Sequence, residues 1–215
     1  TPLIAADSIN KAIIESSGSD VHILATRPST NKPFGKLYLD ENNHVRAILE
    51  PCDERSAICP NLCNTGVIIK TDILKKYIHK ITPNNVKNEI FLTDIVELAY
   101  NAGLKCTYSE LPYDEMCGIN TIQDLAEMEA VFQSKMREKF MNGGVHMVAP
   151  ETVFFSYDTI IEKDVEINPY VIFGLGVHIR AGSVIESFCH IVGADVDQAS
   201  VGPFARLRKG TYLQK

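Results

Sequence analysis

Three of the six cysteines in this chain lie close together, and thiolates are among the side chains best suited to binding a metal ion. Together with a histidine, Cys52, Cys59 and Cys63 could recruit zinc. None of the six cysteines has a paired CxxC spacing, which argues against a structural zinc site. We therefore expect free thiols, as in a reducing compartment, with a structural zinc as the alternative.

A second group of residues, singled out by resemblance to a known family, lies at the ends of expected strands or in turns, where open α/β sheets bind their ligands. This group comprises Gly35, Glu50, Asn64 and Asn120. Three of them also have a structural explanation: a loop hinge for Gly35, a solvated strand end for Glu50 and a braced turn for Asn64. Much later in the chain, Arg208 has a surface charge on a face of the predicted β-helix as its structural explanation.

Alternating strand and helix patterns surround the first four of these residues. Strands are expected at 20–26, 36–39, 45–49, 67–69, 104–110 and 114–119. Helices are expected at 9–16, 71–81 and 93–103, the last with Thr93 as its cap. Such alternation predicts an α/β fold, an open domain with a mainly parallel sheet.

The longest helical pattern runs over 121–141, where apolar residues recur every three or four positions. Its apolar stripe indicates packing within the protein rather than a groove for a partner. We expect this helix to be a linker, which divides the chain into three regions, 1–120, 121–144 and 145–215.

In the last region every sixth residue is apolar, and the residue four positions later is mostly small. The apolar positions are Ile161, Ile167, Phe173, Ile179, Ile185 and Ile191, and the small ones are Val165, Val171, Val177, Ser183 and Cys189. A six-residue period is typical of a left-handed parallel β-helix, in which each rung forms one side of a triangular coil. The spacing falls to five around Asp195, which predicts a modified corner. An ordinary β-sandwich is the alternative.

The length, composition and net charge of the chain limit the classes of protein to which it can belong. The chain has 215 residues, is 45% hydrophobic and carries a net charge of −6, which argues against non-specific nucleic-acid binding. It has no apolar run long enough to span a bilayer and no signal segment, so we expect a cytoplasmic protein without a membrane partner. Because it starts without a methionine and ends on a rung, we expect an internal part of a longer chain.

Four stretches resemble motifs of sugar-1-phosphate nucleotidyltransferases, and a fifth matches a motif associated with one family. They are 34–36 followed by Glu50, 63–67 (CNTGV), 89–95 (EIFLTDI), 118–121 (GINT) and, for the single family, 201–208 (VGPFARLR). That family is the bacterial bifunctional N-acetylglucosamine-1-phosphate uridyltransferase / glucosamine-1-phosphate N-acetyltransferase. The chain resembles it over essentially its whole length.

The resemblance implies a uridyltransferase reaction, in which the phosphate of N-acetylglucosamine 1-phosphate attacks the α-phosphorus of UTP with Mg²⁺ as cofactor. By resemblance, Glu50 and Asn64 would hydrogen-bond the acetamido sugar, and Gly35 would offer its backbone. Asn120 would touch the nucleotide sugar and supply an amide oxygen to the metal. The implied fold is the sugar-binding half of a Rossmann-like nucleotidyltransferase domain, followed by the linker helix and the first coils of the β-helix.

The resemblance also implies acetyl transfer from acetyl-CoA to glucosamine 1-phosphate on the β-helix, with Arg208 pairing with the substrate phosphate, and a homotrimer. No catalytic residue is assigned, because His178 and His190 fall at outward rung positions typical of surface histidines. The family's triphosphate loop, metal carboxylate and later coils have no counterpart in these 215 residues. We therefore expect the chain by itself to be inactive in both reactions.

Several residues depart from the family pattern. Phe34 and Lys36 replace a more usual tyrosine and arginine, Cys52 replaces a lysine and Lys209 replaces a proline. Two alternatives remain open: a nucleotidyltransferase of the ADP-glucose or GDP-mannose type, and a non-catalytic assembly subunit of the same fold.

Overall fold

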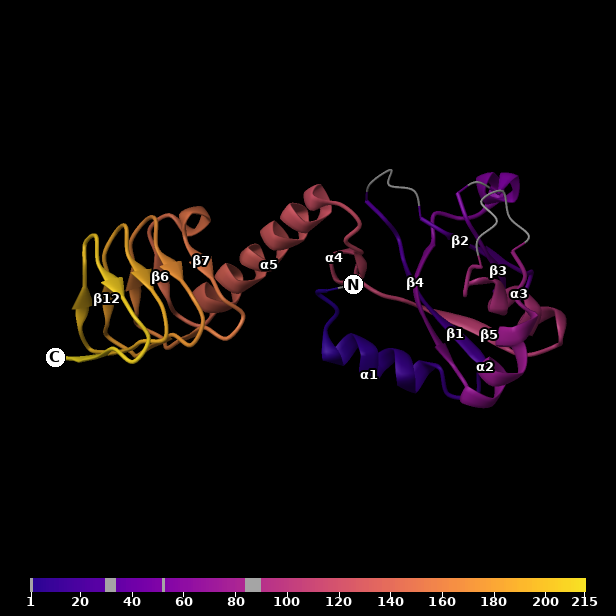
Figure 1. Ribbon diagram of the computed structural model, residues 1–215, viewed down its shortest axis with the longest axis horizontal. Helices are drawn as coiled ribbons and strands as arrows, with labels where there is room; N and C mark the ends of the chain where they lie inside the picture. Colours follow the sequence, from indigo (N-terminus) through magenta and orange to yellow (C-terminus); the bar gives the residue numbers. More distant parts are fainter. Residues whose placement is uncertain (1, 30–33, 52, 84–89) are drawn as a thin grey trace. The chain divides into compact units, whose positions relative to one another are not determined.

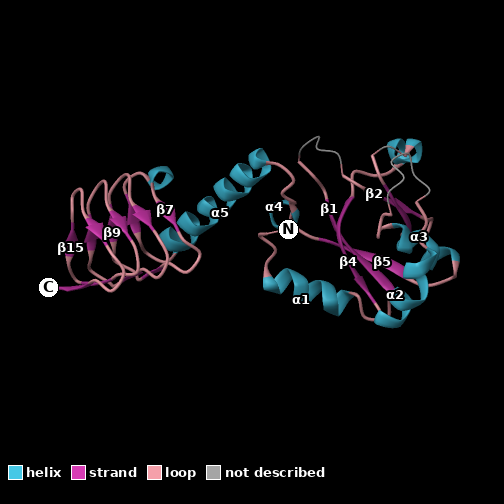
Figure 2. Ribbon diagram, in the orientation of Figure 1, coloured by secondary structure: helices cyan, strands magenta, loops and turns pink. Residues whose placement is uncertain are grey.

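A computed structural model describes residues 2–29, 34–51, 53–83 and 90–215. The chain forms two compact units, Thr1–Met128 and Glu129–Lys215. The first combines a mixed sheet with helices, and the second is dominated by a stack of short strands (Figures 1 and 2). The long helix α5 (Ile122–Asn142) begins in the first unit and ends in the second. Within the described residues, no helix combines the length and the apolar character needed to cross a bilayer.

The first unit is built on a five-stranded sheet in the order β3-β2-β4-β1-β5. Its strands are β1 (Val21–Thr26), β2 (Lys36–Leu39), β3 (Val45–Leu49), β4 (Cys63–Ile69) and β5 (Cys106–Glu110). Among the described pairings of this sheet only β1 with β5 is parallel, and β4 runs antiparallel to both β1 and β2. The prediction of a mainly parallel sheet is therefore wrong. A parallel neighbour requires a crossover connection, whereas a hairpin occupies the chain between β1 and β4.

The hairpin of β2 and β3 lies where the sequence predicts it. Asp40 closes its turn, because Oδ1 of this residue accepts hydrogen bonds from the backbone N–H groups of Asn42 and His44, each at 2.8 Å. Strand β1 is buried along its whole length, as its nearly continuous apolar run indicates.

Helices cover both faces of this sheet (Figure 2). They are α1 (Ala6–Glu15), α2 (Thr71–Tyr77), α3 (Asp94–Asn101) and α4 (Tyr113–Met116), with 3-10 turns η1 (Glu54–Ile58) and η2 (Ile78–Lys80). Helices α2 and α3 pack on the face of β1 that presents Val21 and Ile23, whereas α1 and α4 pack beside Leu24 on the other face. The strand predicted at 114–119 is wrong, since α4 and a loop occupy these residues. Acidic side chains in the first turn favour a helix start there.

A polar layer joins α1 to the sheet beside Leu24. The ring of His22 lies between two hydroxyls, with Nδ1 2.7 Å from Thr107 Oγ1 and Nε2 2.7 Å from Ser109 Oγ. Thr107 Oγ1 also lies 2.7 Å from Ser19 Oγ, and Ser109 donates a short hydrogen bond to the carboxylate of Glu15 on α1. His22 is 2% exposed, and its burial lowers the pKa of the imidazole.

The second unit is a parallel β-helix made of three four-stranded sheets, in the orders β16-β13-β10-β7, β17-β14-β11-β8 and β15-β12-β9-β6. This confirms the predicted left-handed β-helix. Its elements are β6 (His146–Met147), η3 (Pro150–Thr152), β7 (Phe154–Phe155), β8 (Ile160–Ile161), β9 (Glu166–Ile167), β10 (Ile172–Phe173), β11 (His178–Ile179), β12 (Val184–Ile185), β13 (His190–Ile191), β14 (Asp195–Asp197), β15 (Ser200–Val201), β16 (Arg206–Leu207) and β17 (Tyr212–Gln214).

The six-residue ladder forms the core of this unit. Its inward side chains from Ile167 to Ile191 are buried, and so are the small residues two positions before each of them, such as Val165 and Ser183. Left-handed backbone conformations recur at the corners, including non-glycine residues such as Asp164 and Tyr170. The period therefore reflects one inward side chain per rung and one tight corner between rungs.

The break in the ladder shortens one coil by two residues. Residues that pair in neighbouring coils are 18 positions apart before the break, as in Ile172 with His190. Pairs whose coil includes one shortened corner are 17 apart, as in His178 with Asp195, and pairs whose coil includes both are 16 apart, as in Val184 with Ser200. Two corners have each lost one residue. The strands stay aligned because the inward side chains of neighbouring coils still lie above one another.

Helix α5 closes the first end of the β-helix through Gln133. The side-chain amide donates to the carbonyl of Phe155 and accepts from the N–H of the same residue, both at 2.8 Å. Arg137 adds a hydrogen bond from Nε to the carbonyl of Val153 at 3.1 Å, while Met136 and Phe140 join the apolar core. The apolar stripe of this part of the helix is therefore used in packing within the protein, as predicted.

Candidate functional site

Three of the predicted site residues lie together where β2, β3 and β4 meet. The backbone N–H of Asn64, in β4, donates to the carbonyl of Gly35 at 2.8 Å. Glu50 directly follows β3, whose partner in the hairpin is β2, and its side chain lies beside Gly35. The sheet therefore assembles residues that are up to 29 positions apart in the sequence into one small constellation, Gly35–Glu50–Asn64.

Gly35 lies close to the side chains of Ile48 and Glu50. A Cβ atom at this position would lie 3.2 Å from Cγ2 of Ile48 and 3.4 Å from Oε1 of Glu50. A side chain here would therefore crowd the carboxylate and the surface in front of it. This close approach favours glycine at residue 35 over the loop-hinge explanation.

Glu50 has a partner that the sequence did not reveal. Thr93 occupies the cap position of α3, as predicted, but its hydroxyl makes no bond to the helix N–H groups. Instead, Thr93 Oγ1 donates to Glu50 Oε1 at 3.4 Å. The motif 89–95 was therefore correctly placed at a helix start, although Glu89 lies outside the described residues. The sequence does place a hydroxyl residue at the start of a helix and an acidic residue at the end of a strand. It does not show that Thr93 and Glu50 contact each other.

Asn64 presents an unused hydrogen-bond acceptor. Its side-chain oxygen Oδ1 is buried, and no described residue donates to it. Buried amide oxygens almost always have a donor, so this unsatisfied oxygen, in a residue whose backbone N–H bonds Gly35, is a candidate acceptor for a ligand N–H or O–H group. An acetamido N–H or a sugar hydroxyl has the required chemistry.

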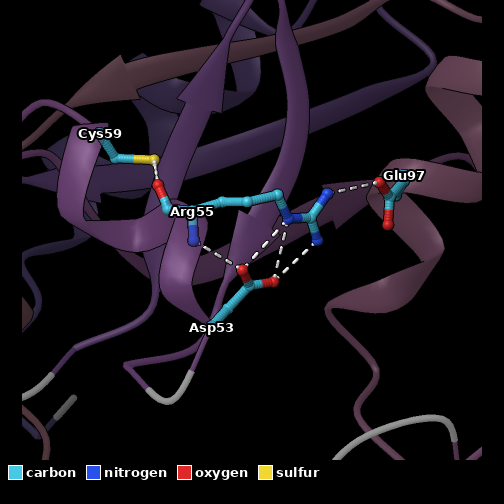
Figure 3. A network of polar contacts seen from close by, with 4 residues as sticks. All are labelled: Asp53, Arg55, Cys59 and Glu97. Carbon is cyan, nitrogen blue, oxygen red and sulfur yellow. Dashed lines mark hydrogen bonds and ion pairs between the residues drawn. The ribbon is translucent and has the colours of Figure 1, made fainter.

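A cavity of about 290 Å³ opens beside Glu50, between β3, η1 and α3. Its polar lining is Glu50, Asp53, Arg55, Lys80, Thr82, Asp94, Glu97 and Asn101. Arg55 bonds Asp53 through Nε and Nη2 and reaches Glu97 through Nη1 at 3.4 Å (Figure 3). The hydrogen bonds from Arg55 lower the pKa of Asp53, whereas burial and then the charge of Glu97 raise the pKa of Asp94.

No contact among the described residues joins Asn120 to Gly35, Glu50 or Asn64. It is exposed just before α5, and its backbone N–H donates to Asp124 Oδ2 at 3.1 Å. Thr121 and Asp124 bond each other reciprocally, which caps the helix. The described residues hold no group of three His, Cys, Asp or Glu side chains arranged for a metal ion.

The cysteines do not form a metal centre within the described residues. Cys59 and Cys63 are buried free thiols, and burial raises the pKa of both. Cys52 lies outside the described residues.

Arg208 belongs to the second unit and is exposed just after β16. Its carbonyl accepts from the N–H and the hydroxyl of Thr211, at 3.1 and 2.7 Å, which fixes the backbone at this corner. His178 instead faces Glu162, with Nε2 3.0 Å from Oε1. That contact supports the prediction of a surface histidine.

Comparison with known proteins gives the same picture across both units. No protein-family model matches the chain. The GlmU protein of Brucella anthropi is 40% identical over 201 residues, which are 91% of this chain and 44% of that protein. GlmU of Zymomonas mobilis is 37% identical over 221 residues (99% and 48%), and GlmU of Wolbachia pipientis is 39% identical over 215 residues (99% and 50%).

The chain is a homologue of the bifunctional GlmU proteins. It spans about half the length of these curated relatives. Because the matches to GlmU cover nearly the whole chain, they include the mixed sheet, α5 and the β-helix. These relatives are named bifunctional proteins, and this chain consists of two units of different architecture.

Proposed function

We propose that the chain provides the sugar-binding part of a uridyltransferase and the first coils of an acetyltransferase. Together, the two activities of the bifunctional enzyme make UDP-N-acetylglucosamine. Acetyl-CoA first acetylates glucosamine 1-phosphate, and N-acetylglucosamine 1-phosphate then reacts with UTP. The observation that supports this most directly is the buried, unsatisfied Oδ1 of Asn64, a residue whose backbone N–H bonds the carbonyl of Gly35.

The constellation is suited to hold an acetamido sugar. The carboxylate of Glu50 accepts hydrogen bonds, and Asn64 offers a second acceptor together with amide N–H donors. Gly35 leaves the space in front of Glu50 free of a side chain. Uridylyl transfer depends chiefly on such positioning and on charge neutralisation. Magnesium, when bound, would neutralise phosphate charge, with Asn120 as one of its oxygen ligands.

The second unit supports a separate role. A β-helix of repeated coils gives a rigid, flat-sided scaffold, and we propose that it assembles as a homotrimer around acetyl-transfer sites. Arg208 is exposed, and the bonded corner at Thr211 holds its backbone, so its guanidinium is available to a substrate phosphate. The small-molecule partners in this proposal are sugar phosphates, UTP and acetyl-CoA.

Titration calorimetry with the 215-residue chain tests the sugar site. N-acetylglucosamine 1-phosphate should bind, and glucose 1-phosphate, which lacks the acetamido group, should bind about fivefold more weakly, as expected for one lost hydrogen bond. Asn64→Leu should abolish this preference. Asn142→Leu, an exposed position at the end of α5, is the matched control and should retain it. Equal binding of the two sugars by the unmodified chain would contradict the proposal.

A further inference from the structure

A closed circuit of contacts runs through Glu50 and α3. The carbonyl of Glu50 accepts from the N–H of Asp53 at 2.9 Å, and Asp53 bonds the guanidinium of Arg55. Arg55 reaches Glu97 on α3, and Thr93, one helical turn before Glu97, donates back to Glu50. Both the backbone and the carboxylate of Glu50 therefore belong to one closed ring of contacts, formed by Glu50, Asp53, Arg55, Glu97 and Thr93.

Arg55 is the joint of this ring (Figure 3). Its guanidinium makes bonds of 3.1 and 2.7 Å to the two oxygens of Asp53, through Nε and Nη2, and one of 3.4 Å to Glu97. Its own carbonyl accepts from the buried thiol of Cys59 at 3.5 Å, which holds η1 in place. Removing the guanidinium would free η1 from α3 without touching Glu50 itself.

We infer that Arg55, with Asp53 and Glu97, is a positioning device that sets the Glu50 carboxylate for the sugar; this inference rests on the proposed function. The ring reaches Glu50 only through its backbone and through Thr93, so Arg55 acts at a distance from the ligand. Its effect is on where the carboxylate lies, and therefore on affinity for any ligand that bonds it.

The same arginine also changes the charge of the cavity, and this second effect has to be separated from the first. Four carboxylates line the cavity, those of Glu50, Asp53, Asp94 and Glu97. Loss of Arg55 makes the wall more negative, which by itself weakens the binding of an anionic sugar phosphate. Loss of the Glu97 charge makes the wall less negative, which by itself strengthens it. A positioning device predicts weaker binding in both cases.

The ion pairs of the ring are half exposed, and such pairs add little to stability. Variants of this ring should therefore remain folded. Arg55→Met opens the ring at its joint, and Glu97→Gln opens it at α3. Glu54→Gln changes the same charge on an exposed neighbour in η1 that is outside the ring, and serves as the matched control.

Calorimetry with the 215-residue chain should use both N-acetylglucosamine 1-phosphate and uncharged N-acetylglucosamine. We expect Arg55→Met and Glu97→Gln to lower the affinity for both ligands about fivefold, which corresponds to the loss of one hydrogen bond. Glu54→Gln should leave both affinities unchanged. Tighter binding of the phosphate by Glu97→Gln, with N-acetylglucosamine unaffected in both ring variants, would replace the positioning role with a charge effect.

Hydrogen exchange in the absence of ligand gives a separate test of the ring. Exchange of the Asp53 amide, which bonds the Glu50 carbonyl, should quicken in Arg55→Met and Glu97→Gln but not in Glu54→Gln. Unchanged exchange in both ring variants would overturn the inference whatever the binding data show. Failure of the unmodified chain to prefer the acetamido sugar would instead overturn the proposed function, and this role with it.

Discussion

The Nε2 atom of His22 lies 2.7 Å from the hydroxyl oxygen of Ser109, and this contact sets which groups donate and which accept in the hydrogen bonds of the polar layer between α1 and the sheet. Ser109 has one hydroxyl proton, which it donates to Glu15. It must therefore accept from His22, whose Nδ1 in the neutral ring accepts from Thr107. Thr107 in turn accepts from Ser19.

This layer makes the stability of the first unit depend on pH. Burial lowers the pKa of His22 below its unfolded value near 6.5, so the unfolded chain binds the extra proton first as the pH falls. Stability should be constant above about pH 6.5 and decline as the pH falls below it. The carboxylate facing the ring is Glu15 on α1, and Asp20 and Lys70, which line a neighbouring cavity, pair with each other.

Thermal melting between pH 7.5 and 5.5 checks this dependence, with His22→Leu as the test variant. The variant should be less stable at every pH, because the hydroxyls of Thr107 and Ser109 lose their partner, but its melting temperature should fall less on acidification. His79→Gln, which removes an exposed histidine on η2, should keep the full decline of the unmodified chain. An equal decline in His22→Leu would rule out His22 as its source.

Gly35→Ala should weaken the binding of N-acetylglucosamine 1-phosphate. The added methyl would lie 3.4 Å from Glu50 Oε1 and 3.2 Å from Ile48, so it crowds both the ligand and its acceptor. We expect about a tenfold loss of affinity, the scale of one displaced hydrogen bond to a charged group. Gly118→Ala is the matched control, because nothing lies within 4 Å of the methyl it adds. Comparable losses in the two variants would remove the special role of residue 35.

Gln133→Leu should destabilise the second unit. The substitution leaves the N–H and the carbonyl of Phe155 buried and without their partner, which costs about 2 kcal/mol or more. Urea unfolding measures this free energy. Gln123→Leu replaces an exposed glutamine earlier in the same helix, whose side chain donates to Glu127 at 3.3 Å, and should change stability by less than about 0.5 kcal/mol. A small effect of both substitutions would show that the helix does not close the β-helix through Gln133.

The shortened coil predicts a difference between two corner glycines. Gly193 and Gly182 both have positive φ, but a methyl on Gly193 would meet the backbone of Lys209 at 2.9 Å, whereas one on Gly182 has its nearest neighbour at 4.0 Å. Gly182→Ala should cost about 1 kcal/mol from backbone strain alone, and Gly193→Ala clearly more. Urea unfolding should separate them, and equal costs would mean that the shorter corner relaxes to make room.

The β-helix was predictable because its signal is local. Each rung places one apolar side chain inward, so the period from Ile161 to Ile191 survives without knowledge of what lies next to it. The break near Asp195 was visible for the same reason, and the structure shows it as two shortened corners. Strand direction in the first unit was not predictable in this way, because pairing depends on how the hairpin folds back on β4.

The constellation of Gly35, Glu50 and Asn64 was found through family motifs, and the structure brings these three together. The partners that surround it were missed. Thr93 and Arg55 act on Glu50 through contacts that bridge separate elements, and no spacing in the sequence reports them. His22 was hidden in an apolar run, since its hydroxyl partners lie about 85 residues away on β5.

The amide of Gln133 gives the β-helix a defined origin. It occupies, on β7, the donor and acceptor positions that a preceding strand would use, so that edge accepts no further strand. The two ends of the β-helix therefore differ, and the bonds from Gln133 fix the position of β7, the strand next to α5.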